Sequence, residues 1–278
     1  LVRLRRQQLL ARVRQGGGAV TALEARVEGI GFWAPGLPTW EAARGFVARG
    51  TLEEGAPRKP SPQLLAANER RRAPQTVAVA LDVALAACAS AGRDPQALPS
   101  VFASTHGDLA ITDYMAATLA DDPRSISPTR FHNSVHNAAA GYWTIGAGSM
   151  APATAISAGA ASFAQGLLEA LAQLHAGADA VLLVAYDIEA SGPLGAMTPS
   201  EGLLGGALVL SRDSDGIRLR ARMGDGAAAA EQGPLARHAG GNAMAPMLPL
   251  FDALAAGGDL ALLQAGPGSM LRVELAHG

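Results

Sequence analysis

The sequence predicts an α/β domain in which helices cover both faces of a sheet that contains parallel strands. The main observation is a strand–helix–strand unit in the middle of the chain. A strand of small residues at 151–156 leads into an alanine- and leucine-rich helix at 157–176, and a wholly apolar strand at 180–184 follows. An apolar strand that comes after a helix is typical of a parallel sheet buried on both sides. With 278 residues, of which 49% are hydrophobic, the chain can bury such a core.

The residues before this unit continue the alternation of strands and helices. Residues 27–32 alternate like a strand, 40–47 favour a short helix, and three prolines within 55–62 indicate a loop. A longer helix starts at Pro74 and ends near Gly92. Its buried stripe consists of Val77, Leu81, Leu85 and Cys88. We expect Cys88 to be a core residue, because a reactive cysteine needs a more exposed and electropositive site.

Further elements are expected on both sides of the central unit. They are a strand at 100–104, a helix at 109–119, an irregular stretch at 125–137, a helix from Ala138, strands at 206–211 and 217–222, a helix at 250–256 and a strand at 271–275. Residues 213–216 separate two of these strands and have the composition of a hairpin turn. Together these elements predict a layered α/β/α sandwich.

Composition and motifs exclude several functional classes. The net charge is −2 and 17% of residues are charged, so we expect no nucleic-acid partner. One cysteine excludes an internal disulfide, fits a cytoplasmic location and leaves no cysteine cluster for zinc. No window approaches the ~18 consecutive apolar residues of a membrane span. Because no GxGxxG, Walker, CxxC or HExxH motif is present, we expect neither a cofactor nor a metal.

The first 18 residues differ from the rest of the chain. They contain five arginines, no acidic residue, and the break Gly16–Gly18. We expect residues 1–18 to be a disordered tail with a glycine linker, and residues 19–278 to be a single domain.

The strand-to-helix turn at 153–159 is the most informative local feature. A side chain presented at such a turn points out of the sheet, and the N–H groups and positive end of the helix can stabilise negative charge beside it. Ile156 and Ser157 are the two side chains that this turn can present.

Several segments, in order along the chain, resemble the β-ketoacyl synthases. Residues 153–159 and the small-residue helix after them are similar to the turn that carries the nucleophilic cysteine in that family, and Ile156 occupies the cysteine position. Residues 127–143, which contain Phe131-His132-Asn133-Ser134-Val135-His136-Asn137, resemble the chain-length-factor-like synthases of aryl polyene pigment pathways, as do 68–74 and 101–104. The resemblance covers residues 26–212. It implies a thiolase-like fold, and the chain corresponds essentially to the N-terminal half of a ketosynthase.

Two departures from the family suggest a silent subunit, a pseudoenzyme. Ile156 has no nucleophilic atom, so an acyl-enzyme cannot form there. The family's pair of histidine donors lies in the second half of its fold, and no matching motif occurs in this chain. Glu201 is displaced from the family's Glu-Gly-Ala signature. The resemblance therefore implies a non-catalytic chain-length-factor-like protein of a type II polyketide or fatty-acid-like synthase.

The resemblance also implies the partners. An active ketosynthase would form a heterodimer across the strand at 151–155, with a homodimer as the alternative, and an acyl carrier protein would bind the pair. The silent subunit would help to wall the acyl tunnel, with Ile156 and Phe163 as candidate wall residues. We also expect an apolar surface that the missing half would normally cover.

Three other interpretations remain open. A serine hydrolase or acyltransferase would use Ser157 with Asp187 and His238, in the order found in α/β-hydrolases, whereas the alternative role for Ser157 is a helix N-cap. His132 and His136 are four residues apart and could bind a metal on one helical face, or belong to a structural network with Asn133 and Asn137. The run Arg70–Arg72 could contact phosphopantetheine or the acidic face of a carrier protein, or be a solvated face.

Overall fold

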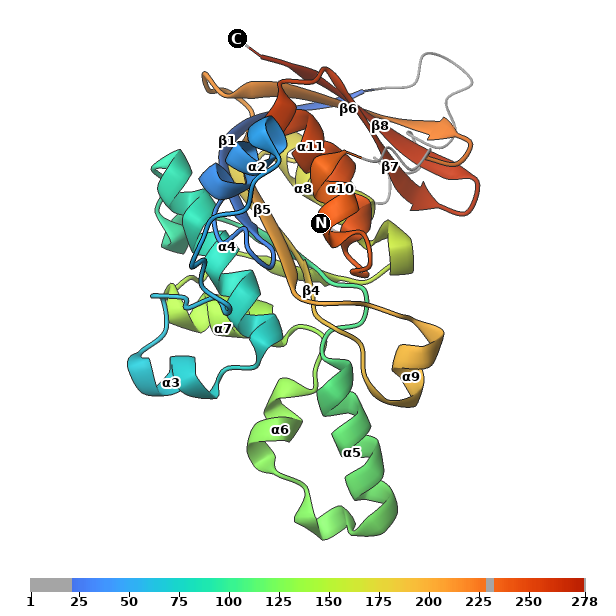
Figure 1. Ribbon diagram of the computed structural model, residues 1–278. Coiled ribbons are helices and arrows are strands. Elements are labelled where there is room, and N and C mark those ends of the chain that lie inside the picture. Colours follow the sequence, from blue (N-terminus) through green and yellow to red (C-terminus); the bar gives the residue numbers. More distant parts are fainter. Residues whose placement is uncertain (1–21, 229–232, 278) are drawn as a thin grey trace.

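The computed structural model describes residues 22–228 and 233–277, and the expected tail at 1–18 lies outside them. In this part of the chain, one eight-stranded sheet has the order β3-β2-β4-β5-β1-β6-β8-β7 (Figure 1). The strands are β1 (Leu23–Trp33), β2 (Ser100–Ala103), β3 (Ala153–Ile156), β4 (Ala180–Asp187), β5 (Leu204–Ser211), β6 (Ile217–Asp225), β7 (Leu260–Gly266) and β8 (Ser269–Ala276). The sheet is mixed, because β2 pairs in parallel with β3 and β4 while the other pairs are antiparallel.

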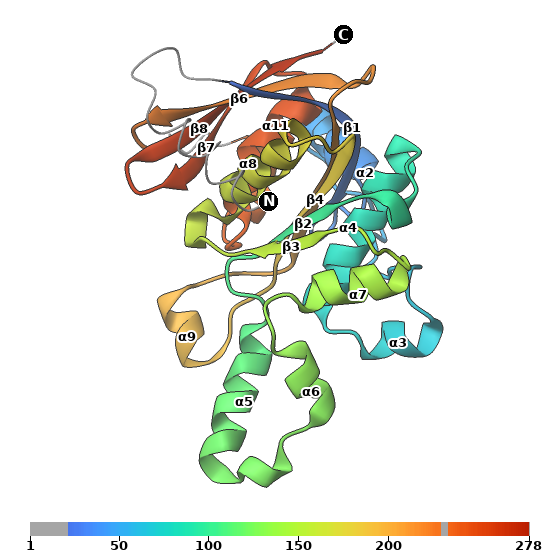
Figure 2. The ribbon, with the colours of Figure 1, turned by 180° about the vertical axis from the view of Figure 1, so that it is seen from behind.

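Helices cover both faces of the sheet, as the sequence predicts. They are α2 (Trp40–Arg49), α3 (Ala67–Arg72), α4 (Gln75–Ala91), α5 (Leu109–Asp121), α6 (Pro128–Asn133), α7 (Ala138–Gly146), α8 (Ser162–His175), α9 (Gly192–Met197), α10 (Pro234–Ala239) and α11 (Leu248–Ala256). Helices α4 and α7 pack on one face, and α8, α11 and α2 pack on the other (Figures 1 and 2). None of the helices in the described ranges is long and apolar enough to cross a membrane.

Helix α4 packs closely against the sheet because β1 offers glycine where the helix crosses it. A Cβ added to Gly31 would lie 2.0 Å from the backbone oxygen of Val83 in α4. The helix ends at Gly92, whose φ of 63° is the left-handed conformation that favours glycine. Cys88 is buried on this helix, and burial raises the pKa of its thiol to about 12. The expectation that Cys88 is a core residue is confirmed.

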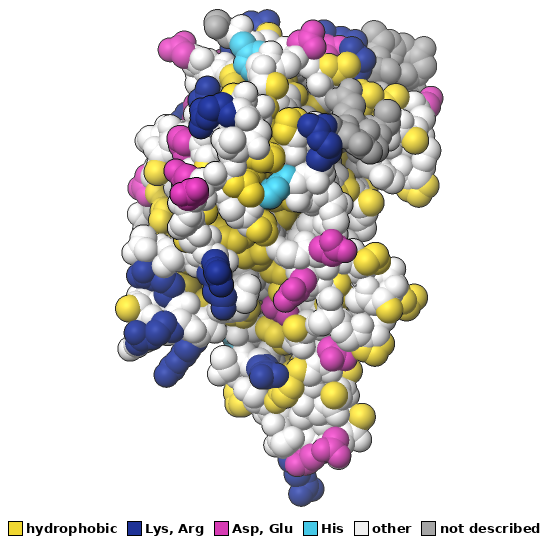
Figure 3. Space-filling model, in the orientation of Figure 1, with side chains coloured by type: hydrophobic (Ala, Val, Ile, Leu, Met, Phe, Trp, Pro, Cys, Tyr) yellow, Lys and Arg dark blue, Asp and Glu magenta, His cyan; other side chains and the backbone are white. Residues whose placement is uncertain are grey.

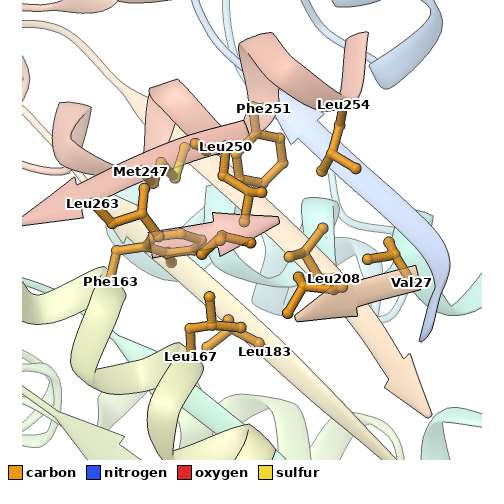
Figure 4. Close-up of a cluster of buried hydrophobic side chains, with 14 of the residues drawn as sticks. Val27, Phe163, Leu167, Leu183, Leu208, Met247, Leu250, Phe251, Leu254 and Leu263 are labelled. Atoms are coloured by element: carbon orange, nitrogen blue, oxygen red, sulfur yellow. The ribbon is translucent and has the colours of Figure 1, made fainter. Parts of the chain in front are cut away.

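The second core lies between α8, α11 and the sheet (Figure 4). Phe163 and Leu167 of α8 are buried there with Phe251 of α11 and Leu263 of β7. The Phe163 and Phe251 ring centroids are 6.2 Å apart. The apolar face of α8 is thus covered by the chain's own later elements. Of these elements, α11 matches the helix predicted at 250–256, whereas β7 was not predicted. The apolar surface expected for contact with a missing half stays a prediction.

Strands β5 and β6 do not form the expected hairpin. The long strand β1 lies between them: Arg26 faces Ser211 of β5 on one side and Arg218 of β6 on the other. With 11 residues, β1 pairs along its first half with β6 and along its second half with β5. The turn at 213–216 therefore joins β5 to β6 across the strand β1 that lies between them. The composition of the turn does not indicate how far it spans.

A lobe formed by α5, α6 and α9 projects beyond the ends of strands β2 and β4 (Figures 1 and 2). The sequence reading treated residues 125–137 as irregular, whereas Pro128–Asn133 form the short helix α6. Large apolar side chains are exposed on the lobe; they are Leu119, Phe131, Val135, Leu194 and Met197.

Candidate functional site

The carboxyl ends of β2, β3 and β4 form the candidate site. The three strands are adjacent and parallel, so the residues that follow them emerge at the same end of the strands. In α/β proteins the carboxyl ends of the strands are where ligands bind and where catalytic side chains lie. Ser104, Thr105 and His106 follow β2, Ser157 follows β3, and Asp187 ends β4.

Asp187 is the centre of a buried hydrogen-bond network. Its carboxylate accepts a bond of 2.6 Å from the Ser104 hydroxyl and one of 2.9 Å from the Thr105 backbone N–H. Burial raises the pKa of Asp187 above its ordinary value, while the bonds from Ser104 and Thr105 and the charge of His106 act in the opposite direction. The Ser104 hydroxyl also accepts a bond from the Gly107 N–H at 2.9 Å. The network fixes the loop after β2 against the end of β4.

Two histidines border this network. The Nδ1 atom of His106 lies 3.9 Å from Asp187 Oδ1, and its Nε2 atom is buried without a hydrogen-bond partner among the described residues. The Nε2 atom of His136 lies 3.0 Å from the Ser104 carbonyl oxygen. Sequence reasoning singled out His136 but missed Ser104, Thr105 and His106. Their position directly after a buried strand was the available signal.

Ile156 is the last residue of β3, in register with Ala103 of β2. Its half-buried side chain packs against the core on the α8 side. Gly159 then turns the chain with a φ of 57°, and the Ser162 hydroxyl accepts a bond of 2.9 Å from the Ala158 N–H at the start of α8. The strand-to-helix turn thus presents a hydrocarbon side chain at the end of β3.

Ser157 is not the N-cap of the following helix. Helix α8 begins at Ser162, after a 3₁₀ turn at Gly159–Ala161, because glycine at 159 bends the chain before the helix starts. The Ser157 hydroxyl donates a bond of 2.7 Å to the Thr105 carbonyl oxygen.

The structure also does not assemble the hydrolase triad. The Nε2 atom of His238 lies 2.7 Å from the Pro35 carbonyl oxygen, and its ring packs against Phe46. The carboxylate of Asp187 contacts the loop after β2 instead. Because Ser157, Asp187 and His238 have separate partners, the serine hydrolase interpretation is not supported.

His132 and His136 do not share a helical face. His132 belongs to α6 and stacks edge-on against Tyr142, whereas His136 lies in the link between α6 and α7. No group of three potential metal ligands occurs within residues 22–228 and 233–277. Asn133 is buried, and its Oδ1 atom has no hydrogen-bond partner in the part of the chain that the structure describes. Asn137 is exposed at the start of α7 and forms no capping side-chain bond there.

A cleft of about 760 Å³ opens between the α5–α6 lobe and the start of α4. Arg58, Arg72, Arg130 and Asn133 line it, together with Asp108 and Glu189. Figure 3 shows basic side chains gathered over the part of the surface formed by α3, where the run Arg70–Arg72 lies. One member of this run, Arg70, donates a bond of 2.9 Å to Gln63 Oε1.

Strand β3 is one edge of the sheet, with β2 as its partner in the described part of the chain. A groove of about 530 Å³ runs between this strand and α7, lined mostly by small residues such as Ala140, Gly141, Ala153 and Ala155. Beside it, Ile145 is 78% exposed and Met150 is 97% exposed. Apolar side chains flanking an unpaired strand edge are typical of a surface that another chain covers.

The mixed eight-stranded sheet with helices on both faces is a thiolase-like fold of the ketosynthase type. Residues 45–265 match the family described as "Beta-ketoacyl synthase, N-terminal domain". The chain belongs to this family. No curated protein matches the chain.

Solved structures of ketosynthases share the fold. The chain is similar to the ketosynthase ApeO in complex with its chain length factor ApeC from Xenorhabdus doucetiae, with a TM-score of 0.72, 24% identity, and coverage of 91% of this chain and 99% of that chain. It is similar to the ishigamide ketosynthase/chain length factor, with a TM-score of 0.71, 14% identity and the same coverage. For a ketosynthase of the bacillaene synthase from Bacillus amyloliquefaciens, with a TM-score of 0.54 and 15% identity, the match covers 73% of this chain but 46% of that one. These likenesses confirm the predicted thiolase-like fold.

Proposed function

We propose that this protein is the non-catalytic, chain-length-factor-like partner of an active β-ketoacyl synthase. The observation that carries the proposal is Ile156 at the end of β3, where the family places its nucleophilic cysteine. Decarboxylative condensation needs a thiolate to hold the growing acyl chain, and an isoleucine side chain cannot form the thioester. The neighbouring Ser157 hydroxyl donates its hydrogen bond to a backbone carbonyl, and no general base among the described residues is bonded to it.

The proposed partner surface is the β3 edge with the α7 groove. The unpaired strand offers backbone N–H and C=O groups to an adjoining strand, and the small residues of the groove permit close approach. The exposed Ile145 and Met150 would then become buried. The similar structures from Xenorhabdus doucetiae and the ishigamide pathway are complexes of a ketosynthase with a chain length factor.

The acyl carrier protein and the product class extend this proposal. One similar structure, with a TM-score of 0.69 and 12% identity, is a ketosynthase bound to its type II polyketide acyl-carrier protein. We assign the chain to an aryl polyene or related polyketide pathway in the cytoplasm, on the motifs in residues 127–143. Ile156 would contribute to the wall of the acyl tunnel. Phe163, the other candidate wall residue, packs against Phe251 in the core, so its substitution would affect folding as well as the tunnel.

Co-expression with the ketosynthase encoded beside it tests the proposal. The expected result is a heterodimer on size-exclusion chromatography with light scattering, and condensing activity that depends on the ketosynthase cysteine. If the protein elutes as a monomer separate from the ketosynthase, or as a homodimer without it, the result would contradict the proposal.

A further inference from the structure

The outer face of β1, β6 and β8 carries a ladder of charged side chains. Its members are Glu24, Arg26, Arg218, Arg220, Arg222, Arg272 and Glu274. The residues that alternate with them, such as Leu219 and Val273, are buried in the core on the α8 side. Because side chains alternate between the two faces of a strand, the ladder lies on the face turned away from that core.

The register of the strands places arginines directly opposite one another. Arg26 of β1 faces Arg218 of β6, and Arg222 of β6 faces Arg272 of β8. Like charges in directly opposite positions destabilise a pair of strands. Two such pairs on one surface therefore cost stability unless an anion lies between them.

The carboxylates of the ladder do not neutralise it. Glu24 Oε1 lies 3.1 Å from Arg220 Nε, and Glu274 Oε1 lies 3.1 Å from Arg272 Nε. Within residues 22–228 and 233–277, Arg26, Arg218 and Arg222 form no ion pair. Asp259 lines a hollow of about 400 Å³ beside Arg218 but forms no ion pair in these ranges either. Outside these ranges the sequence holds one acidic side chain, Glu231, and residues 1–21 contain five arginines and no acidic residue, so the three arginines outnumber the carboxylates that remain.

We propose that this arginine ladder is a docking surface for an acidic segment of another protein. Arg218 and Arg222 are four residues apart on one strand, which spaces their guanidinium groups by about 13 Å along β6. Guanidinium groups bind carboxylates through paired hydrogen bonds, and an acidic segment with carboxylates at this spacing would relieve both like-charge pairs. The ladder lies toward the β7 end of the sheet and β3 forms the opposite edge, so a partner at β3 would contact a different part of the sheet.

A protein segment fits this surface better than nucleic acid does. The whole chain has a net charge of −2, so its long-range field does not attract a polyanion. The ladder itself carries a local excess of positive charge, five arginines against two glutamates, which suits short-range contact with a limited number of carboxylates.

Binding of synthetic peptides to the full chain tests the proposal. The probes are a fluorescent glutamate-rich peptide, the same peptide with glutamine in place of glutamate, and a DNA duplex. We expect the glutamate peptide alone to bind, and its affinity to fall as salt is added. In the double variant Arg218→Gln/Arg222→Gln we expect the affinity to fall about tenfold.

Two controls separate docking from general charge and from misfolding. The variant Arg44→Gln/Arg49→Gln removes two exposed arginines from α2 and should leave peptide binding unchanged. The ladder variant should unfold at the same temperature as the parent or a higher one, because both like-charge pairs are removed. Equal loss of binding in both variants, tighter binding of the DNA or the glutamine peptide, or failure to bind the glutamate peptide would overturn the proposal.

Discussion

Truncation of Ile145 and Met150 should weaken association with the ketosynthase without weakening the fold. Both side chains are exposed in the isolated chain, at 78% and 97%. Burying such a side chain at an interface contributes about 2 kcal/mol, so each change to alanine should raise the dissociation constant about thirtyfold, and the double variant about a thousandfold. Since neither side chain is part of the core, the unfolding temperature of the isolated chain should stay within about 2 °C of the parent.

Isothermal titration calorimetry against the ketosynthase measures this effect, and thermal unfolding of the isolated chain checks the fold. Leu52→Ala is the matched control, because Leu52 is also exposed but lies next to Gly36, which follows β1, four strands away from β3 in the sheet. It should leave the dissociation constant unchanged. An equal loss of affinity in the Leu52→Ala control and in the two single variants, or unchanged affinity in the double variant, would refute the assignment of the β3–α7 surface.

Other predictions concern the core and the site. Phe163→Ala should lower the free energy of unfolding by about 3–5 kcal/mol, measured by urea denaturation, because it empties the core on the α8 side. Gly31→Ala should largely abolish soluble expression, since its Cβ would collide with the Val83 carbonyl oxygen in α4. Burial raises the pKa of Asp187 above its ordinary 3.8, so the protonated carboxyl contributes its full stability below pH 3.8 and loses it as the pH rises through the folded-state pKa. The stability of Asp187→Asn relative to the parent should therefore increase with pH. A difference that does not change with pH would contradict this. Cys88 should react with a thiol reagent at neutral pH only as fast as the chain unfolds, because burial raises its pKa to about 12.

Local patterns in the sequence predicted most of the elements. The buried stripe ending at Gly92 predicted α4, and the run of small residues leading to Ile156 predicted β3. These predictions succeeded because hydrophobic periodicity and glycine reflect the local conformation of the chain. The insertion of β1 between β5 and β6 was missed, since pairing between distant strands leaves no mark in either strand alone.

The candidate site was predicted less completely than the fold. The resemblance identified Ile156, and the structure places it at the end of β3, in register with Ala103 of β2; its correspondence to the nucleophile position stays a prediction. Asp187 was selected only by its order along the chain, and its actual partners, Ser104 and Thr105, come from a strand 83 and 82 residues away. Such a network depends on which strands are neighbours, and that is a property of the sheet order. The role expected for Ser157 failed because the glycine at 159 delays the start of α8.

Intact mass spectrometry of the co-purified pair, after incubation with an acyl thioester of the carrier protein, tests the central claim most directly. Because Ile156 supplies no nucleophile, we predict that the acyl group is found on the ketosynthase and that the mass of this chain does not change. A stable acyl adduct on this chain would show that another of its side chains reacts, and would contradict its assignment as the silent subunit.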